Sequence, residues 1–99
     1  MKLVVSEAAA ADLAPLRAFL ADKSPAAAER AVAVLVAAIQ SLDLFPERGR
    51  PCGPANLPAN LRELIVPFGK SGYVVRYAYS PAANEVVIIR IWHSREERE

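Results

Sequence analysis

Side chains that commonly carry out chemistry are scarce in this chain of 99 residues, which contains one cysteine and one histidine. A single cysteine cannot form a disulfide within the chain, and Cys52 with His93 is too small a set to hold a structural zinc ion. Cys52 lies in a proline-rich stretch without a neighbouring base that would activate its thiol. We therefore expect no metal and no cofactor, and we interpret Cys52 as a bystander.

Long apolar runs and an excess of one charge are also absent. No run approaches the roughly 18 residues that a membrane span needs, and the N-terminus lacks the basic-then-apolar order of a signal peptide, so we expect a cytoplasmic protein without membrane contact. The net charge is +1, which argues against holding DNA by bulk electrostatics, and we expect no direct specific DNA binding. The four glycines do not fall into a phosphate-binding spacing.

Apolar residues make up 54% of the chain, but 19 of them are alanines. The larger side chains are enough for one modest core between two layers of secondary structure, not three. We expect residues 1–99 to form a single domain, as is usual at this length.

The N-terminal third predicts a strand and a helix. The apolar run at residues 2–5 ends at Ser6, whose hydroxyl can cap a following helix. Residues 7–22 predict that helix, because they are rich in alanine and place three leucines on one face: Leu13, Leu16 and Leu20. Pro15 lies inside it, and because a mid-helix proline costs about 3 kcal/mol, we expect a kink or a restart near residues 11–14.

A second helix is expected to start at Ser24 and Pro25, since proline at the first helical position loses no hydrogen bond. It should run to about residue 43, with one buried face made by Ala28, Val32, Leu35, Val36, Ile39 and Leu42. The short connection between the two helices predicts an antiparallel hairpin. Residues 44–60 contain four prolines and two glycines, and predict a long loop.

Three further strands are predicted at residues 61–66, 73–79 and 86–92, the last apolar on both sides and therefore central. The order β-α-α-β-β-β predicts an α+β fold in which a helical hairpin packs on one face of a small, mostly antiparallel, four-stranded sheet. Two helices can cover only one face of such a sheet. We therefore expect a partner to bury part of the remaining surface.

Arginines within the apolar strands require an explanation. Strict alternation puts Arg76 on one face of its strand with Val74 and Ala78, and puts Arg90 with Val86, Ile88 and Trp92. Each guanidinium must reach water, a carboxylate such as Glu63 or Glu85, or a bound anion. Alternatively, Arg62, Arg76, Arg90 and Arg95 form a shared basic surface.

His93 follows the last strand and precedes Ser94 and Arg95. It is either a packed, hydrogen-bonded side chain or a general base. With one histidine and no Ser/His/Asp order, the sequence does not predict a catalytic triad.

Several segments occur in the order typical of one bacterial family. The chain runs through AADLAPLRAFL, a second helix, FPERGRP, LRELIV, GYVVRYAY and VVIIRIWHSREER. This succession resembles the RelE/ParE superfamily of toxins from type II toxin-antitoxin systems, also known as plasmid stabilisation systems, and resembles its ParE-like branch more closely. The resemblance implies a cognate antitoxin whose C-terminal segment lies in a groove beside the helical hairpin. We assign antitoxin binding to Leu13, Leu16, Leu20, Tyr73 and Tyr77.

The superfamily divides by target. RelE-like members are ribosome-dependent mRNA endonucleases that use no metal and rely on strand lysines and arginines with a C-terminal tyrosine, whereas ParE-like members inhibit DNA gyrase. Here Glu63 and Ile65 stand where the resemblance would require lysines, Val74 stands in place of an arginine, and the end of the sequence, EERE, is acidic and has no tyrosine.

The resemblance therefore favours a gyrase inhibitor that is not an enzyme. Its proposed target-binding residues are Arg62, Arg76, Arg90, His93 and Arg95. The alternatives are a RelE-like endoribonuclease acting on ribosome and mRNA through Arg95, His93 and Arg76, or a non-toxic, retargeted binding module of the same fold.

Overall fold

A computed structural model of the chain describes residues 1–52 and 60–95. The expected β-α-α-β-β-β order of an α+β fold is confirmed, with one additional short strand. The elements are β1 (Lys2–Val5), α1 (Glu7–Lys23), α2 (Pro25–Ser41), β2 (Arg50–Pro51), β3 (Leu61–Phe68), β4 (Ser71–Ser80) and β5 (Glu85–His93). Part of the predicted loop, residues 53–59, and the acidic end at residues 96–99 lie outside the described residues.

The sheet has the strand order β1-β5-β4-β3-β2. β1 runs parallel to β5, and the other neighbouring strands are antiparallel. The prediction of four strands was wrong because part of the loop after α2 pairs with the outer edge of β3, where Arg50 lies opposite Glu63 and Pro51 opposite Arg62. β5 lies inside the sheet as expected, although β4 is the middle strand.

Helix α1 is continuous through Pro15, so the predicted restart near residues 11–14 does not occur. Ser6 begins the helix as expected, because its hydroxyl accepts a hydrogen bond from the backbone N–H of Ala9 at 3.1 Å. The three leucines of this helix, Leu13, Leu16 and Leu20, pack partly buried against the core. Their burial offsets the backbone hydrogen bond that proline removes.

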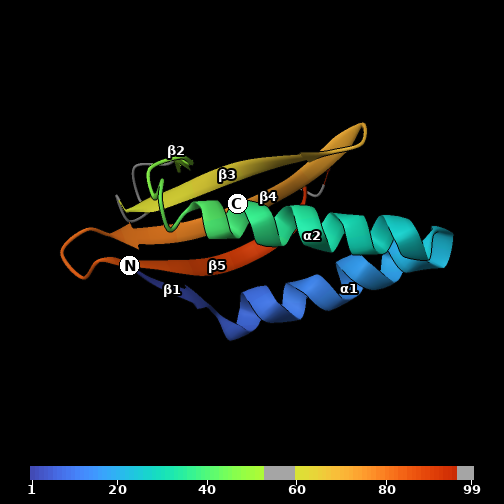
Figure 1. Cartoon of the computed structure of the whole chain (residues 1–99), viewed down its shortest axis with the longest axis horizontal. Helices are drawn as coiled ribbons and strands as arrows, with labels where there is room; N and C mark the ends of the chain where they lie inside the picture. The colour runs from blue at the N-terminus through green and yellow to red at the C-terminus, as the bar shows by residue number, and fades with distance from the viewer. Residues whose placement is uncertain (53–59, 96–99) are drawn as a thin grey trace.

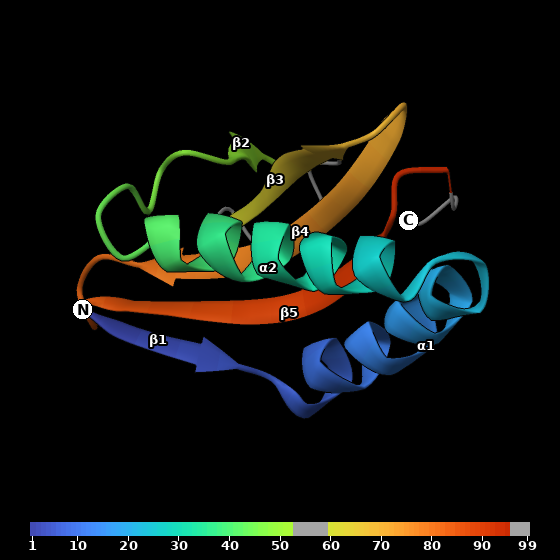
Figure 2. The same cartoon turned by 45° about the vertical axis from the view of Figure 1, so that its right-hand side comes forward.

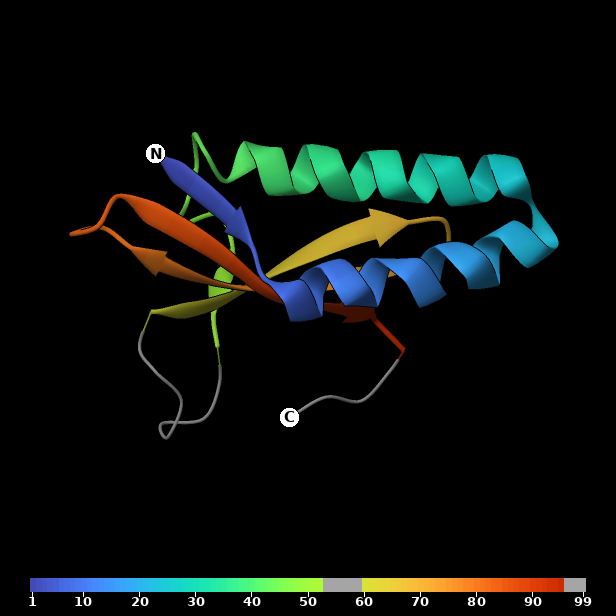
Figure 3. The same cartoon turned by 90° about the horizontal axis from the view of Figure 1, so that it is seen from below.

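The two helices form an antiparallel hairpin on one face of the sheet, as Figures 1 and 2 show, and Figure 3 shows the turn that joins them. α2 ends at Ser41 and buries Ala28, Ala31, Leu35, Ala38 and Ile39. Because alanine side chains are small, this stripe lets α2 pack close to its neighbours α1 and β3. The assignment of Val36 to the buried face was wrong. Its side chain is 43% exposed, because its position on the helix lies to one side of the buried stripe.

The core lies between this stripe and the helix-facing side of β3, β4 and β5. Its largest fully buried side chains are Tyr77, Leu35, Leu42, Ile88, Ile91, Val75 and Val86. Among the described residues, none of the helices is long and apolar enough to cross a membrane.

A register shift in β5 decides where its arginine points. Arg76 lies opposite Arg90, but the next residue along β4, Tyr77, lies opposite Ile88, so Ile89 is an extra residue in β5. Such a bulge reverses the alternation beyond it. The prediction that Arg90 shares a face with Val86 and Ile88 is therefore wrong.

The neighbouring residues Leu35 and Val36 provide a direct test of the assigned core. Leu35 is 2% exposed and Val36 is 43% exposed. We expect Leu35→Ala to lower the free energy of unfolding by about 2–5 kcal/mol because it opens a cavity. Val36→Ala should change it by less than about 1 kcal/mol, because surface substitutions have small effects. Equal effects of the two substitutions in urea denaturation would show that the buried face of α2 is misassigned.

Candidate functional site

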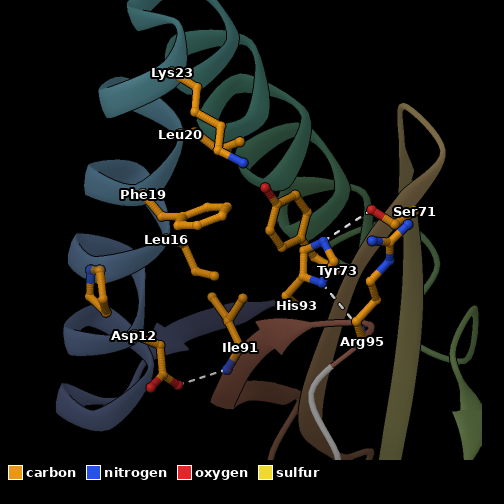
Figure 4. Close-up of a pocket in the computed structure, with 11 residues that line it drawn as sticks. Asp12, Leu16, Phe19, Leu20, Lys23, Ser71, Tyr73, Ile91, His93 and Arg95 are labelled. Carbon is orange, nitrogen blue, oxygen red and sulfur yellow. Dashed lines mark hydrogen bonds between the residues drawn. The ribbon is translucent and has the colours of Figure 1, made fainter.

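A groove of about 680 Å³ separates α1 from the adjacent ends of β4 and β5. Figure 4 shows side chains from the helix and from the strands facing each other across it. Its lining residues are Asp12, Pro15, Leu16, Phe19, Leu20, Lys23, Ser71, Tyr73, Ile91, His93 and Arg95.

One wall of the groove is apolar and is provided by α1. Leu16, Phe19 and Leu20 follow the i, i+3, i+4 spacing and therefore project from one side of the helix. Phe19 is 62% exposed, and the Nζ of Lys23 lies 4.7 Å from the centre of its ring. An exposed aromatic side chain in a concave apolar site is typical of a protein-binding surface.

The opposite wall carries the only histidine of the chain. His93 Nε2 lies 3.0 Å from the hydroxyl oxygen of Ser71, and His93 Nδ1 accepts a hydrogen bond of 3.1 Å from the backbone N–H of Arg95. The ring also meets Tyr73 edge-on, with 5.6 Å between ring centres. Because Nδ1 accepts, the neutral ring carries its proton on Nε2 and donates it to Ser71.

Asp12 closes the groove at its other end. Its carboxylate accepts two hydrogen bonds of 2.9 Å from Arg90 and one of 2.8 Å from the backbone N–H of Ile91. β1 pairs with β5 only as far as Ile88. Beyond that residue, α1 covers the edge of β5 that β1 leaves unpaired. The Asp12 carboxylate also raises the pKa of Arg90 above its ordinary value, through these hydrogen bonds and its charge.

Arg76 has a different carboxylate partner. It lies opposite Arg90 in the register, and because like charges facing each other repel, each arginine requires its own partner. Arg76 donates two hydrogen bonds to Glu63, at 2.8 and 3.2 Å, and its guanidinium lies 5.0 Å from the centre of the Trp92 ring. This pair confirms the alternative in which Glu63 neutralises the strand arginine.

The proposed target-binding residues do not form one basic surface. His93 and Arg95 come together in the groove. Arg76 and Arg90 belong to separate ion pairs, with Glu63 and Asp12. Arg62 donates to the carbonyl oxygens of Glu47 and Gly49, in the loop after α2.

Only some of the proposed antitoxin-binding residues lie in the groove. Leu16, Leu20 and Tyr73 line the groove, whereas Leu13 packs beside the core. Tyr77 has an exposed fraction of 0%, so its side chain has no surface to offer a partner.

Tyr77 instead holds the loop that follows α2. Its hydroxyl donates to the carbonyl oxygen of Pro46 at 2.8 Å and accepts from the N–H of Gly49 at 2.8 Å. A Cβ atom at Gly49 would lie 2.6 Å from that hydroxyl oxygen, so glycine is required for the close approach. Burial raises the pKa of Tyr77, which shows that the ionised form is disfavoured here.

Six groove residues were not predicted as site residues from the sequence: Asp12, Pro15, Phe19, Lys23, Ser71 and Ile91. Phe19 lies beside the leucine stripe and has no periodic signal of its own. Asp12 had a weak sequence signal, since it is the only acidic residue between Glu7 and Asp22 in the alanine-rich helix.

Tyr77→Phe tests the pinning of this loop. Loss of the hydroxyl leaves a buried N–H and a carbonyl without their partner, which should cost on the order of 1–3 kcal/mol of unfolding free energy at neutral pH. Because folding raises the pKa of Tyr77 from its usual value of 10.0, the associated stability is present below that pH and is lost as the pH rises through the folded pKa. The variant should therefore lose less additional stability under alkaline conditions than the wild type. Tyr79→Phe is the control, and an identical profile for it would contradict this role.

Nearly all of the chain matches known toxins. The family model for the ParE toxin of type II toxin-antitoxin systems (parDE) matches residues 3–98. The chain is 40% identical over 96 residues to Toxin RelE1 of Caulobacter vibrioides, covering 97% of this chain and 96% of that protein. It is also 40% identical to Toxin RelE3 of that organism, over 88% of this chain and 87% of the relative. The chain therefore belongs to the ParE toxin family of type II toxin-antitoxin systems, a membership that implies a cognate antitoxin partner.

Proposed function

We propose that this toxin inhibits DNA gyrase by binding it, without cutting RNA, and that the groove beside α1 receives a segment of the antitoxin. The proposal that the toxin does not cut RNA rests on the hydrogen bonding of His93. Both of its ring nitrogens have intramolecular hydrogen-bond partners, so the only histidine is poorly placed to act as a general base.

The strand arginines support the same conclusion. Cleavage of a phosphodiester by its 2′-hydroxyl requires cations that are available to the phosphate as charge develops. Arg76 and Arg90 instead bind carboxylates, with N–O distances of 2.8 and 2.9 Å. An incoming phosphate would have to displace these carboxylates, and Glu63 and Asp12 would repel it.

The shape of the groove supports antitoxin binding. A helical or extended segment with spaced apolar side chains fits against a wall built from Leu16, Phe19 and Leu20. Lys23 and Arg95 also line the groove and favour an acidic residue in the segment. An antitoxin bound there would cover His93 and Arg95, and this explains neutralisation as direct masking of residues that contact the target.

A RelE-like endoribonuclease is the second candidate. The matched relatives are named RelE toxins, and the exposed Arg95 lies beside His93 in the groove. This pair is the one place among the described residues where a cation and an imidazole lie together in an accessible concave site.

Controlled expression in bacteria distinguishes the two candidates. For a gyrase inhibitor we expect induction of the DNA-damage response, gyrase-dependent DNA breaks and loss of supercoiling by purified gyrase, with messages left intact. Rapid arrest of translation with cleaved messages and intact DNA would instead establish the endoribonuclease. Normal growth of cells expressing the folded protein would contradict toxicity itself.

Arg95→Ala tests the shared use of the groove. We expect it to weaken toxicity while leaving antitoxin binding largely intact, because the apolar wall carries most of the antitoxin affinity. Arg17→Ala, which removes a charge from α1 outside the groove lining, is the control. Unchanged toxicity with loss of antitoxin binding in Arg95→Ala would contradict this division of roles.

Phe19→Ala tests the apolar wall itself. Removing this exposed ring should weaken antitoxin binding on the order of tenfold or more, as expected for an aromatic anchor. Titration of the purified antitoxin onto the toxin measures the change. Unaltered affinity would place the antitoxin elsewhere on the toxin.

A further inference from the structure

Asp12 joins helix α1 to the edge of β5 through three hydrogen bonds. Its carboxylate accepts two bonds of 2.9 Å from the guanidinium of Arg90, one to each oxygen, and one bond of 2.8 Å from the backbone N–H of Ile91. The Asp12 side chain is only 13% exposed. A planar guanidinium that binds both oxygens of a carboxylate fixes its orientation as well as its position. This contact therefore restrains the rotation of α1 about its own axis.

The residues that α1 presents to the groove lie on the same side of the helix as Asp12. Leu16, Phe19 and Lys23 follow Asp12 by four, seven and eleven residues. With 3.6 residues per helical turn, all three lie within about 40° of Asp12 around the helix axis. They line the groove together with Asp12, and Figure 4 shows the Phe19 ring pointing from α1 toward Tyr73 on β4. The contact that sets the rotation of α1 at Asp12 thus also sets the direction of the Phe19 ring.

The apolar contacts of α1 restrain its rotation less. This helix lies entirely within the described part of the chain, and Ala9 is its only buried residue. Leu13, Leu16 and Leu20 pack partly buried against the core. Apolar burial is not directional, so these contacts tolerate a small rotation that a bidentate ion pair opposes. The orientation of the helix therefore depends on Asp12 more than on the leucines.

We propose that Asp12 is a positioning residue for antitoxin recognition, which holds α1 in the rotation that turns the ring of Phe19 toward the bound antitoxin segment. Its own carboxylate is engaged by Arg90 and Ile91, so Asp12 acts through Phe19 and does not serve as a contact itself. The inference rests on the proposed use of the groove by the antitoxin. It adds a residue on which the affinity depends although the antitoxin does not bind it.

Glu63 provides a matched control, because it forms a similar ion pair with a strand arginine outside the groove lining. Its side chain is 15% exposed and its carboxylate lies 2.8 Å from the guanidinium of Arg76. Asp12→Ala and Glu63→Ala each remove the carboxylate partner of a strand arginine, so both should lower the melting temperature. We expect Asp12→Ala to weaken antitoxin binding about tenfold, as loss of an aromatic anchor would, and Glu63→Ala to change it by less than about twofold.

A double-mutant cycle tests whether Asp12 acts through the Phe19 ring. Titration of the purified cognate antitoxin onto the folded toxin gives the affinities of wild type, Asp12→Ala, Phe19→Ala and the double variant. The double variant should bind little more weakly than Phe19→Ala alone, because no ring remains to be positioned. Two independent effects would instead multiply to a loss of about a hundredfold, and that result would overturn the inference.

Asp12→Asn is a second variant, for use if Asp12→Ala does not fold. Its amide oxygen can still accept from the N–H of Ile91, but its NH2 group cannot accept from Arg90, so the bidentate contact is lost. We expect a loss of antitoxin affinity that is smaller than that of Asp12→Ala.

The outcomes distinguish this inference from the proposed function. Wild-type affinity in folded Asp12→Asn, or equal losses of affinity in Asp12→Ala and Glu63→Ala, overturns the positioning role while the antitoxin groove stands. If Phe19→Ala itself leaves the affinity unchanged, the proposed use of the groove fails, and the inference fails with it.

Discussion

The structure depends on how the outer edge of β5 is closed. β1 has four residues and leaves β5 after Ile88, where the chain turns at Ser6 into α1. The hydroxyl of Ser6 donates to the carbonyl oxygen of Ile89, and Asp12 accepts from the N–H of Ile91. Since unpaired backbone groups at a buried edge are costly, these side chains fix α1 along the second half of β5. The groove is the space that remains between the C-terminal half of α1 and the strand ends.

The same constraint sets the position of α2 and of the loop that follows it. α1 is held at β5, so α2 lies toward β3, and the loop that follows α2 is carried to the far end of the sheet. There Tyr77 has a role similar to that of Asp12 at the groove: its buried hydroxyl bonds two backbone groups of the loop, as the Asp12 carboxylate bonds the backbone N–H of Ile91. A polar side chain thus ties each of these segments to the sheet, Asp12 for α1 and Tyr77 for the loop after α2.

The sequence allowed the element order, the caps and the helical hairpin to be predicted, because Ser6, Ser24 and Pro25 act through local chemistry. Features that depend on contacts between distant segments could not be predicted. Helix α1 continues through Pro15 while its leucines pack, partly buried, against the core, and the extra residue Ile89 is visible only once β5 is paired with β4. At the site, Leu16 and Leu20 belong to the predicted periodic stripe and Tyr73 was assigned with the family resemblance, whereas the roles of Asp12 and Phe19 depend on the residues that face them.

The ion pairs of the strand arginines support the proposal that this toxin acts by binding. In an apolar strand a guanidinium must be neutralised from within or left available to a ligand. Glu63 stands directly opposite Arg76, and Asp12 reaches Arg90 from α1, so both charges are used to hold the sheet and the helix in place. A lysine at position 63 would leave Arg76 unpaired and would place two cations side by side, which is the arrangement that a phosphate requires. The acidic side chain of Glu63 therefore gives Arg76 a structural partner within the sheet, which agrees with the proposed binding function.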